Sequence, residues 1–495
     1  MKMKKSLFAV CAGTMLLITG CGPTTEEILA MHDDDLVAGN FEKSLPLMEE
    51  KIKEDKENTH EDTPMWRLLV SNAKMLTNDP KAIEEFDKAE DVILQNKKRN
   101  QFGAYTAAML VNDKMLDFQS RFQDKMFISI DKATMYAAAG NRNAARTELN
   151  RMMQYQENYL HELKAEIAAS SEAMTKSLQP AKKDEKSDIP PNVQEQIDKL
   201  KIEAKNTFDN LCNNDNVLGL ILKHCSYDLK NSGDFSKLKP ADYQNAYAAH
   251  FCGVFRWLNN DNGAMYLKDA AKLNTVSKTV AADSADADKN VMPKDEVWVY
   301  VEDGLCQKRE ESRIDLPIAL VPFLGNYVKY FGIALPKFVA RANAAEKYTV
   351  SGADMEELES IDRLLKIEYD IYMNSAVKRE LLRALLKTLP QVAAGIIKDQ
   401  SKGNFQVMAA CEGVAYASAG YALASTQADL RTWNVLPKRV LVKRVKRPAD
   451  GIIKFAADGV NTDIKVAEGN SIIVIRKVAK TSPVIIRQIN FAASK

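Results

Sequence analysis

Hydrophobic residues recur at intervals of three and four positions over the first third of the chain. This spacing places them on one side of a helix, and it runs through residues 41–55 and 144–170 among many charged side chains. Gly39 and Gly140, each followed by asparagine, lie between two such runs, where glycine commonly ends a helix. The pattern predicts a helical, repeat-like domain over residues 21–175.

Two polar stretches interrupt this pattern. The first is highly charged and contains three prolines, and the second has few large apolar residues. Such compositions are typical of linkers or long loops. We therefore expect linkers at 176–198 and 275–296, on either side of a second helical block at 199–274.

The period changes after Glu296. Residues 297–304 form a β-branched and aromatic run that ends in Asp-Gly, which predicts a β-hairpin with the following segment 309–320. Helical spacing returns at 355–389. Residues 405–425 predict a helix rich in alanine, glycine and serine.

The last sixty residues have a β pattern. Five short β-branched runs are separated by Asp-Gly, Glu-Gly-Asn and Ser-Pro, which predicts a small sheet or sandwich. The fold class expected is α+β, mainly α, with a hairpin and helical region at 297–435 and a small C-terminal β domain at 436–495. Whether this β tail folds independently is left open.

A strongly basic segment begins the β tail. Between Arg431 and Arg447 there are seven lysines or arginines and no acidic residue. We interpret it as an edge strand whose charges prevent edge-to-edge pairing, with Trp433 and Pro437 at the junction of helices and sheet. The alternative is contact with an anionic envelope surface through Lys443, Arg444, Lys446 and Arg447.

The first twenty residues differ from the rest. A basic start and a short apolar run, typical of a secretory signal peptide, lead to Ile18-Thr19-Gly20-Cys21. This ending resembles the lipobox of bacterial lipoproteins, which implies that residues 1–20 are removed and that Cys21 carries acyl chains such as palmitate. Gly22, where an aspartate would favour retention, implies the periplasmic face of the outer membrane, with the inner membrane as the alternative.

Net charge argues against nucleic-acid binding. The chain has 68 basic and 67 acidic residues, and removal of Lys2, Lys4 and Lys5 would leave 65 against 67, or about −2. Nucleic-acid binding depends on a positive potential, so we expect no nucleic-acid partner.

Three segments resemble tetratricopeptide helix–turn–helix units: 36–52, 135–152 and 246–274. They share asparagine-containing turns and small residues, such as Ala145, where two helices would pack closely. Their irregular spacing predicts separate hairpins rather than a continuous solenoid. The alternative is a set of unrelated helical hairpins that follow the same packing rules.

The order of elements resembles a group of uncharacterised bacterial lipoproteins with tetratricopeptide-like repeats. Three short segments carry this resemblance: Arg313-Ile314-Asp315-Leu316-Pro317, Gly332-Ile333-Ala334-Leu335-Pro336 and Asp429-Leu430-Arg431-Thr432-Trp433-Asn434-Val435-Leu436-Pro437. It implies an envelope protein without an inherited active site.

Motifs for chemistry are missing. The chain has no phosphate-binding loop, dinucleotide fingerprint or nucleophile elbow, so we expect no catalytic residue and no cofactor. Zinc-type ligands occur at Cys212, His224, Cys225, His250 and Cys252, but no C-x-x-C pair anchors them, and we interpret them as buried cysteines and surface histidines. The cysteines beyond Cys21 are odd in number, which leaves at least one thiol unpaired, and their pairing stays open: Cys212, Cys225, Cys252, Cys306 and Cys411.

Two apolar stretches have nearly the length of a membrane span. Prolines and Lys329 interrupt residues 316–336, which favours a buried or groove-lining segment. Glu412 lies in the middle of 405–425 and would be costly in hydrocarbon. The small residues of that helix favour tight packing against 355–389 or against a partner.

These features together predict a lipid-anchored periplasmic scaffold or accessory protein that binds protein partners in an envelope complex. The alternatives are an enzyme or enzyme activator acting on cell-wall polymer, with its site in residues 297–436, and a component of transport or secretion machinery.

Overall fold

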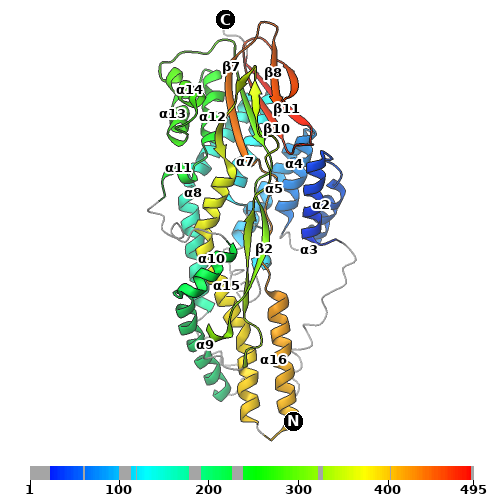
Figure 1. The fold of residues 1–495 in the computed structure, drawn as a ribbon, viewed down its shortest axis with the longest axis vertical. Helices are drawn as coiled ribbons and strands as arrows, with labels where there is room; N and C mark the ends of the chain where they lie inside the picture. The colour runs from blue at the N-terminus through cyan, green and yellow to red at the C-terminus, as the bar shows by residue number, and fades with distance from the viewer. Residues whose placement is uncertain are drawn as a thin grey trace.

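A computed structural model describes residues 23–58, 62–99, 113–118, 120–177, 191–225, 238–320, 327–401 and 403–491. Helices predominate, and the molecule is elongated, with strands at one end and a pair of long helices at the other (Figure 1). The expected α+β class with mainly helical content is confirmed. The predicted division of the chain into separate domains is not confirmed, because strands from distant parts of the chain share one sheet.

The first helical region follows the predicted periodicity. Gly39 and Gly140 adopt positive φ angles of 79° and 81°, so both glycines end helices as expected. Ala145 is fully buried in the contact between two antiparallel helices. The region comprises α2 (Thr25–Ala38), α3 (Leu45–Asn58), α4 (Thr63–Leu76), α5 (Lys81–Arg99), α7 (Phe122–Ala138) and α8 (Arg142–Ser177).

The second helical block extends further than predicted. The linker expected at 275–296 contains the helix α14, which Ser277 caps and whose Val280 and Asp283 are buried, so that prediction was wrong. Part of the linker expected at 176–198 lies in α9, and residues 178–190 lie outside the described residues. The block comprises α9 (Pro191–Cys212), α10 (Asp215–Cys225), α11 (Pro240–Tyr243), α12 (Ala246–Leu258), α13 (Ala264–Leu273) and α14 (Lys278–Asp288).

The larger sheet contains strands from both the middle and the end of the chain. Its order is β11-β10-β1-β7-β6, with β1 and β10 parallel and the other neighbours antiparallel. The strands are β1 (Glu296–Asp303), β6 (Glu356–Ser360), β7 (Arg439–Lys446), β10 (Asn470–Lys477) and β11 (Val484–Phe491).

This pairing corrects two predictions. The expected hairpin between 297–304 and 309–320 does not form, because β1 pairs with β7 and β10, whereas β2 (Lys308–Asp315) pairs with β3 (Gly332–Val339). β1 is buried at every position, so it needs neighbouring strands on both sides. The polar β2 is only partly buried and has no such requirement. The basic strand β7 lies between β1 and β6, but β6 pairs only with its first half, Arg439–Val442. The expected edge strand is therefore wrong for that half, whereas residues 443–446 pair with β1 alone.

The β tail is not a separate domain. Three of its strands belong to the larger sheet, and β8 (Ile452–Ala457) and β9 (Val460–Lys465) form a second sheet with β4 (Tyr348–Val350) and β5 (Ala353–Asp354). The larger sheet is covered on both faces. Trp298 and Tyr300 pack among the helices, while Val299 and Phe455 belong to the core between the two sheets.

Two long antiparallel helices extend from this body (Figure 1). Ser360, at the end of β6, caps α15 (Ile361–Gln400), and α16 (Phe405–Ser425) returns along it. The hairpin of β2 and β3 packs along α15. We call α16 together with the last part of α15, residues 386–400, the arm.

The burial of His32 on α2 has a consequence for pH. The side chain is 1% exposed, its Nδ1 lies 2.8 Å from Ser44 Oγ, and burial lowers its pKa to about 4. Between pH 7 and pH 5 the unfolded chain gains a proton at this histidine that the folded chain does not. The free energy of unfolding should therefore decrease by about 2 kcal/mol through this histidine when the pH is lowered from 7 to 5.

His32→Asn is expected to remove that loss. Urea unfolding at pH 7 and pH 5 measures it, with the exposed His161→Gln as the control. An unchanged difference between the two pH values in His32→Asn would show that His32 is not responsible.

Candidate functional site

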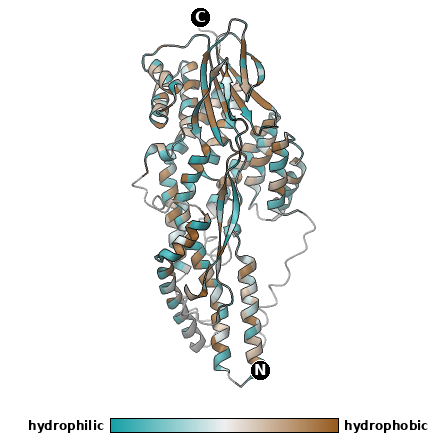
Figure 2. Cartoon of the chain, in the orientation of Figure 1, coloured by the Kyte–Doolittle hydropathy of each residue, from teal (hydrophilic) through white to brown (hydrophobic). Residues whose placement is uncertain are grey.

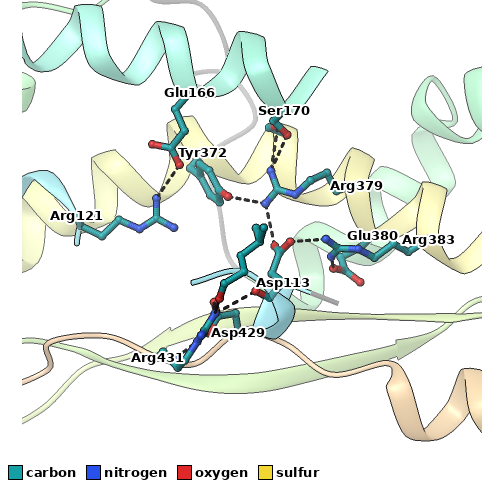
Figure 3. Close-up of polar contacts among 12 residues, drawn as sticks. Asp113, Arg121, Glu166, Ser170, Tyr372, Arg379, Glu380, Arg383, Asp429 and Arg431 are labelled. Atoms are coloured by element: carbon teal, nitrogen blue, oxygen red, sulfur yellow. Dashed lines mark hydrogen bonds and ion pairs between the residues drawn. The ribbon is translucent and has the colours of Figure 1, made fainter. Parts of the chain in front are cut away.

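An aspartate at the centre of several arginines joins the body to α15 (Figure 3). Asp113 accepts hydrogen bonds from Arg379 Nη2 at 2.9 Å and from Arg383, and both arginine side chains are 1% exposed. Burial alone would raise the pKa of Asp113, but the two guanidinium groups hold it well below its usual range. The short turn at 113–118 is thereby fixed against the helix.

Sequence reasoning missed this cluster. Arg379 and Arg383 are four residues apart, so they lie on the same side of α15, and both are buried. Two arginines at this spacing among the leucines of the helix were the available signal. Their partner could not be found in advance, because Asp113 lies more than 260 residues away and no spacing distinguishes it from the other carboxylates.

Arg431 connects three further segments. Its guanidinium binds Asp429 through Nε at 2.9 Å and Nη2 at 2.8 Å, and Nη1 binds Asp62, just before α4, at 2.7 Å. It also donates to the backbone carbonyls of Asp113 and Leu116 at 3.1 and 2.9 Å. The predicted junction near Trp433 is thus a network of charged hydrogen bonds, and Trp433 itself is buried against Phe86.

The three segments singled out by the family resemblance come together in space. In the β2–β3 ladder Arg313 pairs with Ala334 and Asp315 with Gly332. Arg313 then donates to the carbonyl of Leu423 at the end of α16, at 2.8 Å. Segment 429–437 follows directly, so all three lie where the body meets the arm.

Two adjoining cavities lie in this region. The first, which we call the arginine cavity, has a volume of about 80 Å³ and lies between β3, α15 and the turn at 113–118. The second, the helical groove, has about 300 Å³ and lies between α5, α7 and α8. They share four lining residues: Phe118, Arg121, Glu166 and Glu368.

The basic strand is neutralised within the chain. Lys443 binds Glu356 at 2.8 Å, and Arg444 binds Asp283 at 2.9 Å and Asp286 at 2.8 Å. Lys446 pairs with Glu296 at 2.8 Å, although its side chain is 72% exposed, and Arg447 donates to the carbonyl of Ala467 at 2.8 Å. Contact of these four residues with an anionic surface stays a prediction.

The zinc-type residues are not assembled into a site. In the parts of the chain that the structure describes, no three His, Cys, Asp or Glu side chains are placed to hold a metal ion. His250, which we expected at the surface, is fully buried between Tyr300 Oη at 2.9 Å and Asp283 Oδ2 at 3.0 Å, and these bonds offset its desolvation. The free thiols are Cys212, Cys225, Cys252, Cys306 and Cys411.

The arm carries an apolar surface. α16 buries Cys411 and three alanines against its surroundings, and Glu412 is paired with Lys398 and Lys329. Figure 2 shows α16 mostly in the colours of intermediate and hydrophobic residues. Its exposed positions contain no charged residue: Phe405, Gln406, Ala409, Ala410, Gly413, Tyr416, Ala417, Gly420, Tyr421, Leu423 and Ala424.

Over the described ranges, no helix combines the length and the apolar character needed to cross a membrane. Cys21, the expected lipid attachment site, lies outside the described residues. Comparison with protein-family models, with curated proteins and with solved structures finds no match.

Proposed function

We propose that this chain is a lipid-anchored periplasmic scaffold or accessory protein, which holds a protein partner of an envelope complex on the exposed face of α16. The observation that carries the proposal is the uncharged face at the end of a projecting arm. A helix that is apolar on all sides is normally covered on all sides. Among the described residues, α15 packs along one side of α16, and Lys329 and Arg313 contact single positions of it, while the eleven positions named above stay exposed.

The exposed face favours a helix of a partner protein as its occupant. A Cβ atom added at Gly413 or Gly420 would meet no atom within 4 Å, so another backbone can approach closely along this line. Tyr416 and Tyr421, 60% and 40% exposed, flank it and offer both apolar area and a hydroxyl group. This arrangement suits close packing of a partner helix along a face of small residues.

The proposed lipid on Cys21 would keep the chain at the membrane while the arm holds its partner. Acyl chains contribute about 0.8 kcal/mol for each buried CH₂ group, so a multiply acylated cysteine anchors firmly. Cys21→Ser, which removes the attachment atom, is therefore the control for location in every cellular experiment. If the Cys21→Ser variant no longer fractionates with membranes, the predicted lipid anchor is supported, whatever α16 binds.

Site-specific photo-crosslinking in intact cells tests the arm. A crosslinking amino acid at position 416 is expected to give one discrete protein adduct, whose crosslinked peptide belongs to an amphipathic helix. Ala417→Glu with Gly420→Glu should reduce this adduct at least about tenfold, because a charge in an apolar contact costs more than 1.4 kcal/mol. Both positions are exposed, so the fold should be retained.

Gly219→Glu is the matched control. Gly219 is also an exposed helical glycine with no atom within 4 Å of its Cβ position, but it lies on α10. Equal adduct yields from both variants would refute docking on α16. An adduct that joins two copies of this chain, or crosslinking to lipid alone, would refute a partner protein as the occupant.

A further inference from the structure

The arginine cavity contains a cation that makes no direct ion pair among the described residues, although carboxylates lie nearby. Arg309 on β2 donates from Nη1 to the carbonyl of Arg431 at a long 3.4 Å, and its Nε is buried with no partner among the described residues. Its guanidinium lies 5.8 Å from the ring of Phe338. Burial and the like charge of Arg121 both lower the pKa of Arg309. An anion beside Arg309 would complete its hydrogen bonds.

The same cavity contains a carboxylate oxygen without a donor. Glu368 on α15 is 8% exposed, and its Oε1 accepts from the backbone N–H of Phe122 at 3.2 Å. Its Oε2 is buried and has no hydrogen-bond partner within the described ranges. Burial raises the pKa of Glu368. A positively charged donor in the cavity would satisfy this oxygen.

Two neighbouring arginines have carboxylate partners, whereas neither Arg309 nor Glu368 has a charged partner within 4.0 Å among the described residues. Arg431 binds Asp429 and Asp62, and Arg379 binds Asp113. Arg309 and Glu368 both line the arginine cavity, and the hydrogen bonds of each go to backbone groups, not to the other side chain. Glu368 is a buried carboxylate, and such a charge without a partner costs several kcal/mol, whereas Arg309 is partly exposed and only its Nε is buried. Two opposite charges held apart in one cavity therefore point to a ligand with both signs of charge.

Size narrows the ligand class. An apolar cavity of about 150 Å³ can hold benzene, so the 80 Å³ of the arginine cavity suits a molecule of only a few non-hydrogen atoms. Leu335, Met373 and Ala376 provide an apolar wall that fits a short side chain. The adjoining helical groove supplies a further 300 Å³ beyond Arg121 and Glu368.

We propose that the arginine cavity binds a small zwitterionic amino acid, with its carboxylate on Arg309 and Arg121 and its ammonium group on Glu368 Oε2. Arg121 is available because its contact with Glu166 is long, at 3.5 Å, and its guanidinium stacks 4.4 Å from the ring of Tyr372. The site adds a ligand-sensing element at the junction of body and arm. It is independent of what α16 binds.

Isothermal titration of the full chain tests this, with glycine, L-alanine and D-alanine as probes. At least one probe is expected to bind saturably with 1:1 stoichiometry. N-acetylglycine, which lacks the ammonium group, and glycinamide, which lacks the carboxylate, should bind at least about tenfold more weakly, since each loses a charged hydrogen bond. These comparisons use the unaltered protein, so they do not depend on a variant that folds.

Two variants locate the binding. Arg309→Gln and Glu368→Gln should each weaken binding at least about tenfold, whereas Glu172→Gln, at an exposed position of α8, should not. The absence of saturable binding by all three amino acids would overturn the proposal. Equal binding of N-acetylglycine would show an anion site only, equal binding of glycinamide a cation site only, and either result would overturn the zwitterion assignment.

Discussion

Asp113→Ala is expected to lower the free energy of unfolding by about 4 kcal/mol, because it leaves buried arginines without their counterion. Arg379 would retain Ser170 Oγ at 3.0 Å and Tyr372 Oη at 2.6 Å, but neither carries a charge. Arg383 would retain its ion pair with Glu380 on the same helix, but it would lose the carboxylate that ties it to the turn at 113–118. The turn at 113–118 would also lose its attachment to α15. Urea unfolding followed by circular dichroism measures the change.

Two further variants separate charge from volume. Asp113→Asn keeps the shape of the side chain but removes its charge, and it should still be clearly destabilising. Asp288→Ala breaks a surface pair with Lys268, in which the side chains are 56% and 53% exposed, and should cost less than about 1 kcal/mol. An Asp113→Asn variant as stable as the original chain would refute the role of the charge.

Arg444→Gln should be the second most damaging change, at about 3 kcal/mol. Its Nη1 binds the fully buried Asp283, whose other oxygen accepts from His250 and Trp298. The guanidinium also lies 5.0 Å from the ring of Trp298, a favourable cation–π distance. Removing the cation leaves a buried carboxylate without its countercharge. The urea midpoint again gives the effect.

Lys446→Gln, two residues along the same strand, is the matched control. Lys446 is largely exposed and pairs with a single glutamate, so its loss should change stability by less than about 1 kcal/mol. Equal destabilisation by both variants would contradict the distinction between buried and exposed pairs. If Lys446→Gln instead impaired envelope fractionation at unchanged stability, the predicted anionic contact would be supported.

The location of the candidate sites has a physical explanation. The body meets the arm where β2, β3, α15 and segment 429–437 converge, and charged groups of α15 and of segment 429–437 are buried there. Most are paired with one another, which fixes the junction. Arg309 and Glu368 are the exceptions that motivate the ligand proposal, and the uncharged face of α16 motivates the partner proposal.

Local sequence patterns were sufficient to predict several of the helices. The period of three to four residues predicted the helices at 41–55 and 144–170, and the glycines at 39 and 140 ended helices as expected. These features depend on neighbours within one or two turns, so the sequence alone determines them. The same holds for the strand at 297–304, whose β-branched and aromatic residues identified it.

Strand partners could not be predicted in this way. Val297 pairs with Ser471, more than 170 residues later, and nothing in either segment specifies the other. The Asp-Gly after β1 suggested a local hairpin, but a strand buried on both faces is more stable between β7 and β10 than beside the polar β2. The edge-strand prediction was wrong for the first half of β7, which pairs with β6. The charges of its second half gave no indication that Arg444 binds a buried carboxylate on α14.

The sequence by itself determined most of the helices, the strand β1, the strands of the C-terminal tail, the mainly helical α+β class and the apolar character of α16. Only the tertiary structure decided which strands pair, which charges are buried together, and that Asp113, Arg309 and Glu368 line one cavity. The reason is that periodicity reports on neighbours along the chain. The partners of a buried charge are chosen by packing between segments that the sequence keeps far apart.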